Sequence, residues 1–155
     1  MGQHGSVERE ARALADGIDA ALPGWVERSV ERLLVASQGR ADAAVMAAAR
    51  EAGARARADI GGRARALLEA DIDRQRANPL SLLRDAVRYP TEVLRRAGVP
   101  PVARDDFMTA RFPDDDYGLT PASFADVDPA LHELGIAWGA AKAWAHKQRH
   151  AGAGP

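Results

Sequence analysis

Apolar side chains recur every three or four residues along a proline-free stretch of 37 residues, 41–77. This spacing places them on one face of an α-helix. The members of that face are Val45, Ala49, Ala52, Ala56, Ile60, Ala64, Leu67 and Ile72. Because its first half is built from Ala and Gly53, the backbone of a partner helix can approach closely there. We predict one long central helix over 41–77, with a bend or a mobile point at Gly61-Gly62.

Two further apolar stripes precede the central helix, and Pro23-Gly24 separates them. The first stripe is Val7, Ala11, Leu14, Ile18 and Leu22, and the second is Trp25, Val26, Val30, Leu33, Leu34 and Ser37. Ser6 suits the N-cap of the first helix, and Gly39 suits the end of the second. Since proline removes a helical hydrogen bond, the pattern predicts two shorter helices packed antiparallel against the central one, a helical hairpin over 6–77.

The composition of the chain changes at residue 78, because the segment 78–127 is rich in proline. Asn78-Pro79 has the composition of a helix start, and Gly98 has that of a helix end. Short helices are predicted between them, with one more over 105–112. The remainder, 113–127, is predicted to be irregular.

A final helix is predicted over 128–149, since Asp128-Pro129 is a start signal and an apolar stripe follows it. The stripe consists of Leu131, Leu134, Trp138, Ala141 and Ala145. No stretch alternates with the period of two that a β-strand requires. The chain is therefore predicted to be a single all-α domain, with disordered tails at 1–5 and 151–155.

The amino-acid composition argues against several classes of function. The 155 residues fit one domain, and a formal net charge of −1 argues against a general nucleic-acid coat. The absence of cysteine excludes disulfides, thiol catalysis and cysteine-ligated zinc. The N-terminus lacks the features of a secretory signal, and no apolar run is long enough to cross a membrane. These features predict a cytoplasmic protein without membrane attachment.

Charge is distributed unevenly in the second half of the chain. Residues 105–135 carry eight acids and one arginine, whereas residues 77–104 carry five arginines and two acids. Four of these arginines form a cluster in sequence, Arg84, Arg88, Arg95 and Arg96. One hypothesis pairs this cluster with the acidic segment inside the fold. The other makes it a site for phosphate, RNA or an acidic protein, since arginine binds oxyanions through two parallel hydrogen bonds.

The run Asp114-Asp115-Asp116 carries the oxygen ligands that a divalent cation prefers, and Asp126 and Asp128 are further candidates. Its spacing matches no calcium-binding loop, however, and three acids after a proline also suit a solvated turn. We therefore predict no metal and no other cofactor, and keep the three aspartates as the candidates for a cation site.

The histidines give no strong indication of metal binding or catalysis. His146 and His150 share a helical face, a spacing that can hold a metal, but no third ligand is recognisable. His132 has no serine or cysteine partner at a catalytic spacing. The sequence also lacks a phosphate-binding glycine loop, a zinc-protease motif and a nucleophile elbow. No catalytic residue is assigned, and the sequence favours a protein that is not an enzyme.

Two faces of the final helix carry apolar residues. Trp144 lies at the edge of the apolar stripe, while Ile136 and Ala140 lie on the opposite side, where a surface helix is ordinarily polar. Either the chain covers both faces or one of them contacts a partner, since aromatic residues are favoured in interface cores. For Trp25, in the N-terminal region, the same two possibilities are open: burial within the chain or contact with a partner.

Two segments, NPLSLLRDAVRYPTEVLRRAGVPPVARDDF and DDDYGLTPASFADVDPALHELGIAWGAAKA, resemble a family of small helical proteins from high-GC actinobacteria. The resemblance covers residues 78–142, and the abundance of Ala and Arg is typical of such genomes. No function is known for that family. The resemblance therefore implies a cytoplasmic actinobacterial protein and assigns no role to any residue.

The sequence supports three hypotheses about function. The first is a non-enzymatic interaction or regulatory adaptor protein, which presents the proline-rich segment and the Trp144 edge to a protein partner or to a second copy of itself. The second is RNA or nucleoprotein binding through the Arg84–Arg96 cluster. The third is a small-ligand binder or enzyme with a pocket between the long helix and the proline-rich segment. Its first candidates are Tyr89, Arg88, Asp115 and His132.

Overall fold

The structure, a computed structural model, describes residues 4–70 and 78–152, which form helices and loops without a strand. The prediction of an all-α fold is therefore confirmed. In chain order the helices are α1 (His4–Gln38), α2 (Ala43–Ala70), α3 (Pro79–Asp85), α4 (Arg88–Arg96), α5 (Asp106–Arg111), α6 (Phe124–Val127) and α7 (Ala130–Gly152). Among the described residues, none of these helices combines the length and the apolarity that a membrane crossing requires.

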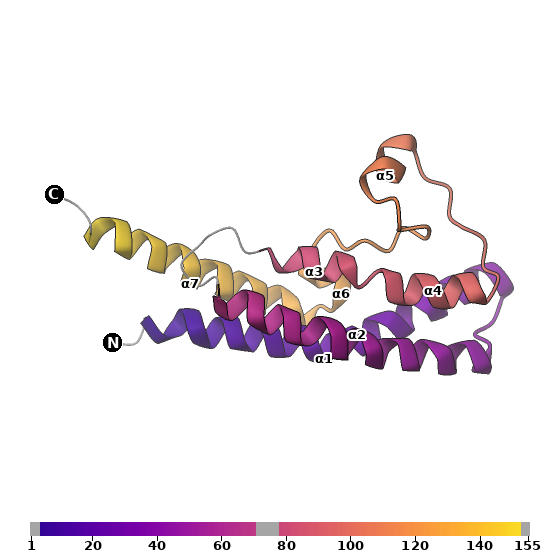
Figure 1. The fold of residues 1–155 in the computed structure, drawn as a ribbon, viewed down its shortest axis with the longest axis horizontal. Helices are drawn as coiled ribbons and strands as arrows, with labels where there is room; N and C mark the ends of the chain where they lie inside the picture. The colour runs from indigo at the N-terminus through magenta and orange to yellow at the C-terminus, as the bar shows by residue number, and fades with distance from the viewer. Residues whose placement is uncertain (1–3, 71–77, 153–155) are drawn as a thin grey trace.

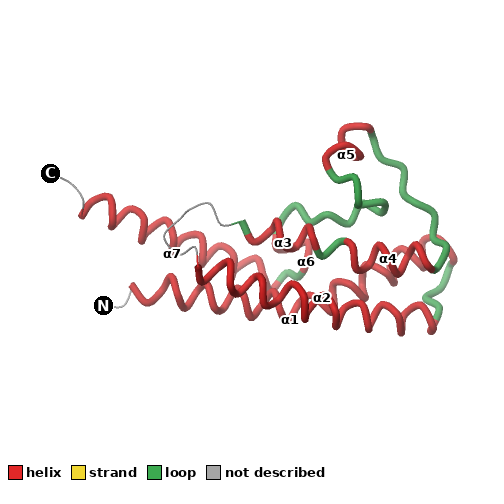
Figure 2. The backbone as a smooth tube through the Cα atoms, viewed as in Figure 1, coloured by secondary structure: helices red, strands yellow, loops and turns green. Residues whose placement is uncertain are grey.

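The two longest helices, α1 and α2, run antiparallel along each other and form the base of the molecule (Figure 1, Figure 2). The last helix, α7, packs along α1. At the other end, α4 packs on both α1 and α2, while α3 packs on α2. The start of α1 and the end of α7 lie at the same end of the elongated molecule (Figure 1).

The apolar stripes predicted from the sequence form the core. The buried apolar residues of α1 are Val7, Ala11, Leu14, Ala15, Ile18, Ala21, Leu22, Trp25, Val26, Val30 and Leu34, and those of α2 are Ala49, Ala52, Ala56, Ile60, Ala64 and Leu68. Of the other predicted stripe members, Leu33, Val45 and Leu67 are only partly buried, and Ser37 is exposed. Leu83, Leu94 and Leu131 bring α3, α4 and α7 into the same cluster. Each large apolar side chain buried in this way stabilises the fold by about 1.5–3 kcal/mol.

The helix α1 is continuous, so the predicted break at Pro23-Gly24 is wrong, and the two predicted N-terminal helices are one. Leu22, Trp25 and Val26 are buried on either side of the proline and hold this part of the face in the core. Burial of an amphipathic face stabilises a helix more than local propensity does, and it offsets the hydrogen bond lost at the proline. Ser6, predicted to cap the first helix, lies inside α1.

The helix α2 is also continuous through Gly61-Gly62, the pair at which the sequence predicts a bend or a mobile point. Gly61 is buried against the side chain of Asp19 in α1, which leaves no space for a Cβ atom. A Cβ atom at Gly53 would lie 2.9 Å from the Cα atom of Pro23. The small residues of α2 therefore permit the close backbone approach that the sequence predicts. Residues 71–77, the predicted end of this helix, lie outside the described residues.

Helix boundaries in the second half follow the predicted signals. The Asn78 side chain caps α3 by accepting a hydrogen bond from the Leu80 amide at 3.1 Å. Gly39 and Gly98 end α1 and α4 with positive φ angles of 80° and 77°, a conformation that other residues rarely adopt. The helix predicted over 105–112 corresponds to α5.

The predicted boundaries differ from those of the structure in two places. The short helix α6 lies within 113–127, which the sequence predicts to be irregular. Part of each predicted tail is helical, because α1 begins at His4 and α7 ends at Gly152. The remaining tail residues lie outside the described residues.

Gly53 and Gly62 allow a matched test of the α1–α2 contact. A Cβ atom at Gly62 meets nothing within 4 Å, so Gly62→Ala should raise the free energy of unfolding by about 0.5–1 kcal/mol through helix propensity. Gly53→Ala gains the same propensity but presses a methyl group against the Pro23 backbone, at a cost of about 1–3 kcal/mol. Urea denaturation followed by circular dichroism should show Gly53→Ala to be the less stable variant. Equal stabilities would contradict the close contact.

Candidate functional site

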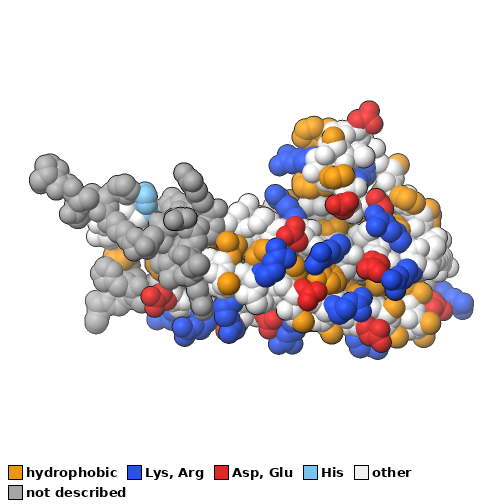
Figure 3. All heavy atoms as spheres, in the orientation of Figure 1, with side chains coloured by type: hydrophobic (Ala, Val, Ile, Leu, Met, Phe, Trp, Pro, Cys, Tyr) orange, Lys and Arg blue, Asp and Glu red, His pale blue; other side chains and the backbone are white. Residues whose placement is uncertain are grey.

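The segment 100–116, which we call the arm, projects from the helical bundle between α4 and α6 and carries α5 (Figure 1). The helix α5 buries none of its residues. The large apolar side chains of the arm are exposed, with Phe107 at 66%, Val102 at 45% and Met108 at 36%. Figure 3 shows hydrophobic side chains gathered on the projecting part, with an acidic side chain at its tip. The arm therefore adds little to the core and offers an apolar surface.

The base of the arm is fixed to the bundle. Arg95 forms an ion pair with Asp116 at 2.5 Å, and the Val102 amide donates a hydrogen bond to the Asp116 carbonyl at 2.9 Å. The hydroxyl of Tyr117, which is buried, donates to the Val99 carbonyl at 2.7 Å. These bonds join the chain that enters the arm to the chain that leaves it. The arm is therefore anchored at its base, while α5 projects from the bundle.

The three consecutive aspartates at the base have three different environments. Asp115 is buried, and its carboxylate accepts hydrogen bonds from the Leu119 and Thr120 amides, both at 2.8 Å, and from the Thr120 hydroxyl at 2.5 Å. Asp116 pairs with Arg95, and Asp114 is exposed. Among the described residues, no group of three or more His, Cys, Asp or Glu side chains is placed to hold a metal ion. Asp115 instead organises the loop that leads to α6.

The four arginines of the cluster contact different partners. Arg96 pairs with Glu92 one turn earlier at 2.8 Å, and the Arg88 guanidinium donates to the Tyr89 hydroxyl at 3.0 Å. Within the described residues, Arg95 alone of the four forms an ion pair with the acidic segment. Arg84 turns toward the base of the arm, where its guanidinium carbon lies 5.8 Å from the centre of the Phe112 ring.

Tyr89 links α4 to α2. Its hydroxyl donates a hydrogen bond to the Asp59 carboxylate at 2.5 Å. Burial raises the pKa of the Tyr89 phenol above its ordinary value, the bond to Asp59 raises the pKa further, and the Arg88 guanidinium opposes this rise. The neutral phenol is therefore the form that the fold stabilises.

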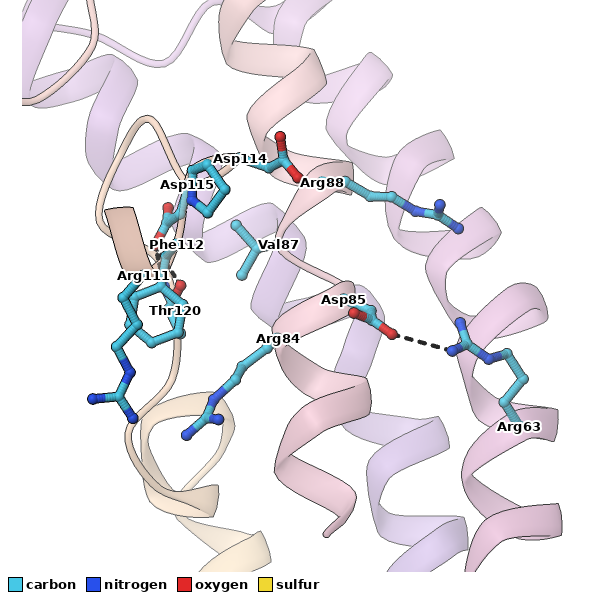
Figure 4. Close-up of a pocket in the computed structure, with 11 residues that line it drawn as sticks. Arg63, Arg84, Asp85, Val87, Arg88, Arg111, Phe112, Asp114, Asp115 and Thr120 are labelled. Carbon is cyan, nitrogen blue, oxygen red and sulfur yellow. Dashed lines mark hydrogen bonds and ion pairs between the residues drawn. The ribbon is translucent and has the colours of Figure 1, made fainter. Parts of the chain in front are cut away.

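A cleft of about 490 Å³ lies between α2, the junction of α3 with α4, and the base of the arm (Figure 4). One hypothesis from the sequence places a pocket between the long helix and the proline-rich segment, and this cleft is lined by Arg63 of α2 together with residues of the segment 84–120. Arg88 and Asp115 line it, as expected, whereas Tyr89 and His132 do not. The lining also includes Arg63, Arg84, Arg111 and Phe112.

The remaining candidates lie elsewhere. Trp25 is 5% exposed and belongs to the core, so it does not provide a surface for a partner. On α7, Ile136 is 54% exposed and Trp144 is half-buried, so each of the two side chains is partly accessible. His132 and His146 are exposed, and the side chain of His150 lies outside the described residues.

Sequence reasoning missed the exposed side chains of the arm and two arginines of the cleft. A signal for Phe107 and Met108 exists, because they follow Asp105-Asp106 in a helix of six residues, too short to bury an apolar face of its own. Arg63 and Arg111 carry no such signal, since they are 48 positions apart and meet only in the folded chain.

The chain matches no protein-family model, no curated protein and no solved structure. The resemblance to an actinobacterial family therefore stays a prediction. Function is inferred from the arm and the cleft.

Asp115 and Asp114 form a matched pair for testing the role of the aspartate run. Asp115→Asn should lower the free energy of unfolding by about 1–3 kcal/mol, because an amide cannot accept all three hydrogen bonds of the buried carboxylate. Asp114→Asn, at an exposed position, should change it by less than about 0.5 kcal/mol. Urea denaturation measures both. A stabilisation by Ca²⁺ that Asp115→Asn abolishes would indicate a cation site instead.

Tyr89→Phe removes the donor to Asp59 and should lower the free energy of unfolding by about 1 kcal/mol near neutral pH. Because the folded-state pKa of Tyr89 is raised, the stabilisation is fully present below the unfolded value of about 10 and is lost as pH rises through the folded value. The difference in stability between wild type and variant should therefore stay constant up to about pH 9 and shrink above pH 10. A difference that widens at alkaline pH would refute this assignment.

Proposed function

We propose that this protein is a cytoplasmic, non-enzymatic interaction protein that inserts the arm into an apolar groove of a partner protein. The observation that carries the proposal is the exposure of Phe107 and Met108 on a helix that buries none of its residues. An exposed aromatic side chain costs free energy in water, and clustered exposed apolar groups typically mark an interaction site. The anchored base supports the proposal, because it reduces the ordering cost that binding would otherwise carry.

The charges of the arm favour a groove with a basic rim. Asp105 and Asp106 are exposed beside Phe107, and the Asp105 carboxylate also caps α5 by accepting a hydrogen bond from the Met108 amide at 2.7 Å. Complementary charge around an apolar contact speeds association and excludes wrong partners. The Arg111 guanidinium carbon lies 6.0 Å from the centre of the Phe107 ring, so the acidic side of Phe107 is the one formed by Asp105 and Asp106. We therefore expect Phe107 to enter an apolar pocket while Lys or Arg side chains of the partner face Asp105 and Asp106.

Nucleic-acid binding has less support. Arg95 and Arg96 are paired with carboxylates, and Arg88 is bonded to Tyr89. On the face shown in Figure 3, acidic side chains are interspersed among the arginines. Phosphate binding along a nucleic acid requires a continuous basic surface, and mixed charge of this kind does not provide one.

The proposal can be tested by placing the photo-crosslinking residue benzoyl-phenylalanine at position 107 and identifying the protein that it captures in host cells. The purified partner is then titrated with wild type, Phe107→Ser and Ile136→Ser. Phe107→Ser should weaken binding at least about 30-fold, as expected for an aromatic anchor. Ile136→Ser is the matched control on α7, with similar exposure, and should change binding less than about twofold. Association should also slow as salt is added.

Other outcomes are equally informative. If Ile136→Ser rather than Phe107→Ser abolishes binding, the interface lies on α7. If position 107 crosslinks to a second copy of the chain and the purified protein is a dimer, the partner is the protein itself. If no specific product forms at position 107, the role of the arm is wrong. Both substitutions lie at exposed positions, so neither should change stability by more than about 0.5 kcal/mol.

A further inference from the structure

The cleft at the base of the arm combines cationic side chains from three separate segments. Arg63 comes from α2, Arg84 from α3 and Arg111 from the end of α5. At about 490 Å³, the cavity has the size of sites that hold small molecules. It is distinct from the exposed apolar tip of the arm, although both involve α5.

The lining of the cleft carries an excess of one positive charge, from the four arginines Arg63, Arg84, Arg88 and Arg111 against the three aspartates Asp85, Asp114 and Asp115. Arg63 donates a hydrogen bond to Asp85 at 3.1 Å, and both oxygens of Asp115 accept hydrogen bonds from the loop. In the described part of the chain, Arg84 and Arg111 form no ion pair with a carboxylate. Two guanidinium groups of the cleft are therefore available to an external anion.

Arg84 and Arg111 are held near each other by one aromatic ring. Their guanidinium carbons lie 5.8 Å and 5.4 Å from the centre of the Phe112 ring. Figure 4 shows the two guanidinium groups at the same end of the cleft. Attraction between the ring and each cation favours these positions, so part of the side-chain ordering is already present before an oxyanion binds.

The Arg84 guanidinium also has an unsatisfied donor. Its Nε atom is buried and has no hydrogen-bond acceptor among the described residues. A buried charged donor without an acceptor is costly, and two like charges beside one ring repel each other. An anion with several oxygen atoms, bound between the terminal amino groups of Arg84 and Arg111, would offset this repulsion.

We propose that the cleft binds a small molecule carrying a dianionic oxyanion group, either a phosphate monoester or a dicarboxylate. Arg84 and Arg111 clamp the oxyanion, and the rest of the molecule extends toward Arg63 and Arg88. Phe107 and Met108 do not line the cleft, but the Arg111 guanidinium carbon lies 6.0 Å from the centre of the Phe107 ring, so the cleft adjoins the apolar surface of the arm. Binding to the cleft is measured on the protein alone, so its test does not require the partner proposed for the arm.

The test is isothermal titration calorimetry with three probes at constant ionic strength, namely inorganic phosphate, glycerol 3-phosphate and succinate. One or more probes should bind wild type with a stoichiometry of one. Arg84→Gln and Arg111→Gln should each weaken that binding at least about tenfold, because each removes charge-assisted hydrogen bonds. Arg96→Gln is the matched control outside the cleft and should bind as wild type does. Selective binding of the phosphates or of succinate identifies the ligand class.

The proposal is overturned if no probe binds at about 10 mM, a concentration at which even weak specific sites are occupied. It is also overturned if either folded cleft variant binds as wild type does, or if Arg96→Gln weakens binding to the same extent. Should Arg84→Gln fail to fold, Arg111→Gln decides the question, because Arg111 is exposed.

Discussion

The close backbone contact between α1 and α2 is the constraint on which the other elements depend. The Pro23 backbone lies against Gly53, where a larger residue would separate the two helices, and the Asp19 side chain fills the space beside Gly61. Alanines at 49, 52, 56 and 64 keep the interface narrow along most of its length. The remaining helices pack on this pair, with α7 along α1 and α4 across both. The pair therefore fixes where α3 and α4 present their arginines and where the arm leaves the bundle.

The two candidate sites, the apolar surface of the arm and the cleft, both include residues of α5, a helix that buries none of its residues in the core. Phe107 and Met108 are exposed on α5, whereas Arg111, at the end of the same helix, and Phe112 line the cleft. Binding residues often lie on segments that a rigid framework positions but does not bury. Since α5 contributes nothing buried, its sequence is free of packing requirements and can be specialised for contact.

The fold could be predicted from local patterns because its core faces follow the helical period. Asn78, Gly39 and Gly98 set boundaries through interactions within a few residues. The effect of Pro23 on the helix could not be predicted from local pattern, since α1 continues through the proline where the residues around it are buried in the core. The same limit applies to the sites. Of the pocket candidates, the sequence identified Arg88 and Asp115, but the partners of Arg84 depend on how the arm folds back.

Hydrogen exchange measured residue by residue tests the central claim most directly, namely that a continuous α1–α2 scaffold carries an arm outside the core. Amides on both sides of Pro23 should exchange as slowly as those in the middle of α2, because they belong to one packed unit. Amides of α5 should exchange faster than those of the other helices. Rapid exchange around Pro23, or protection of α5 equal to that of α1, would contradict the account.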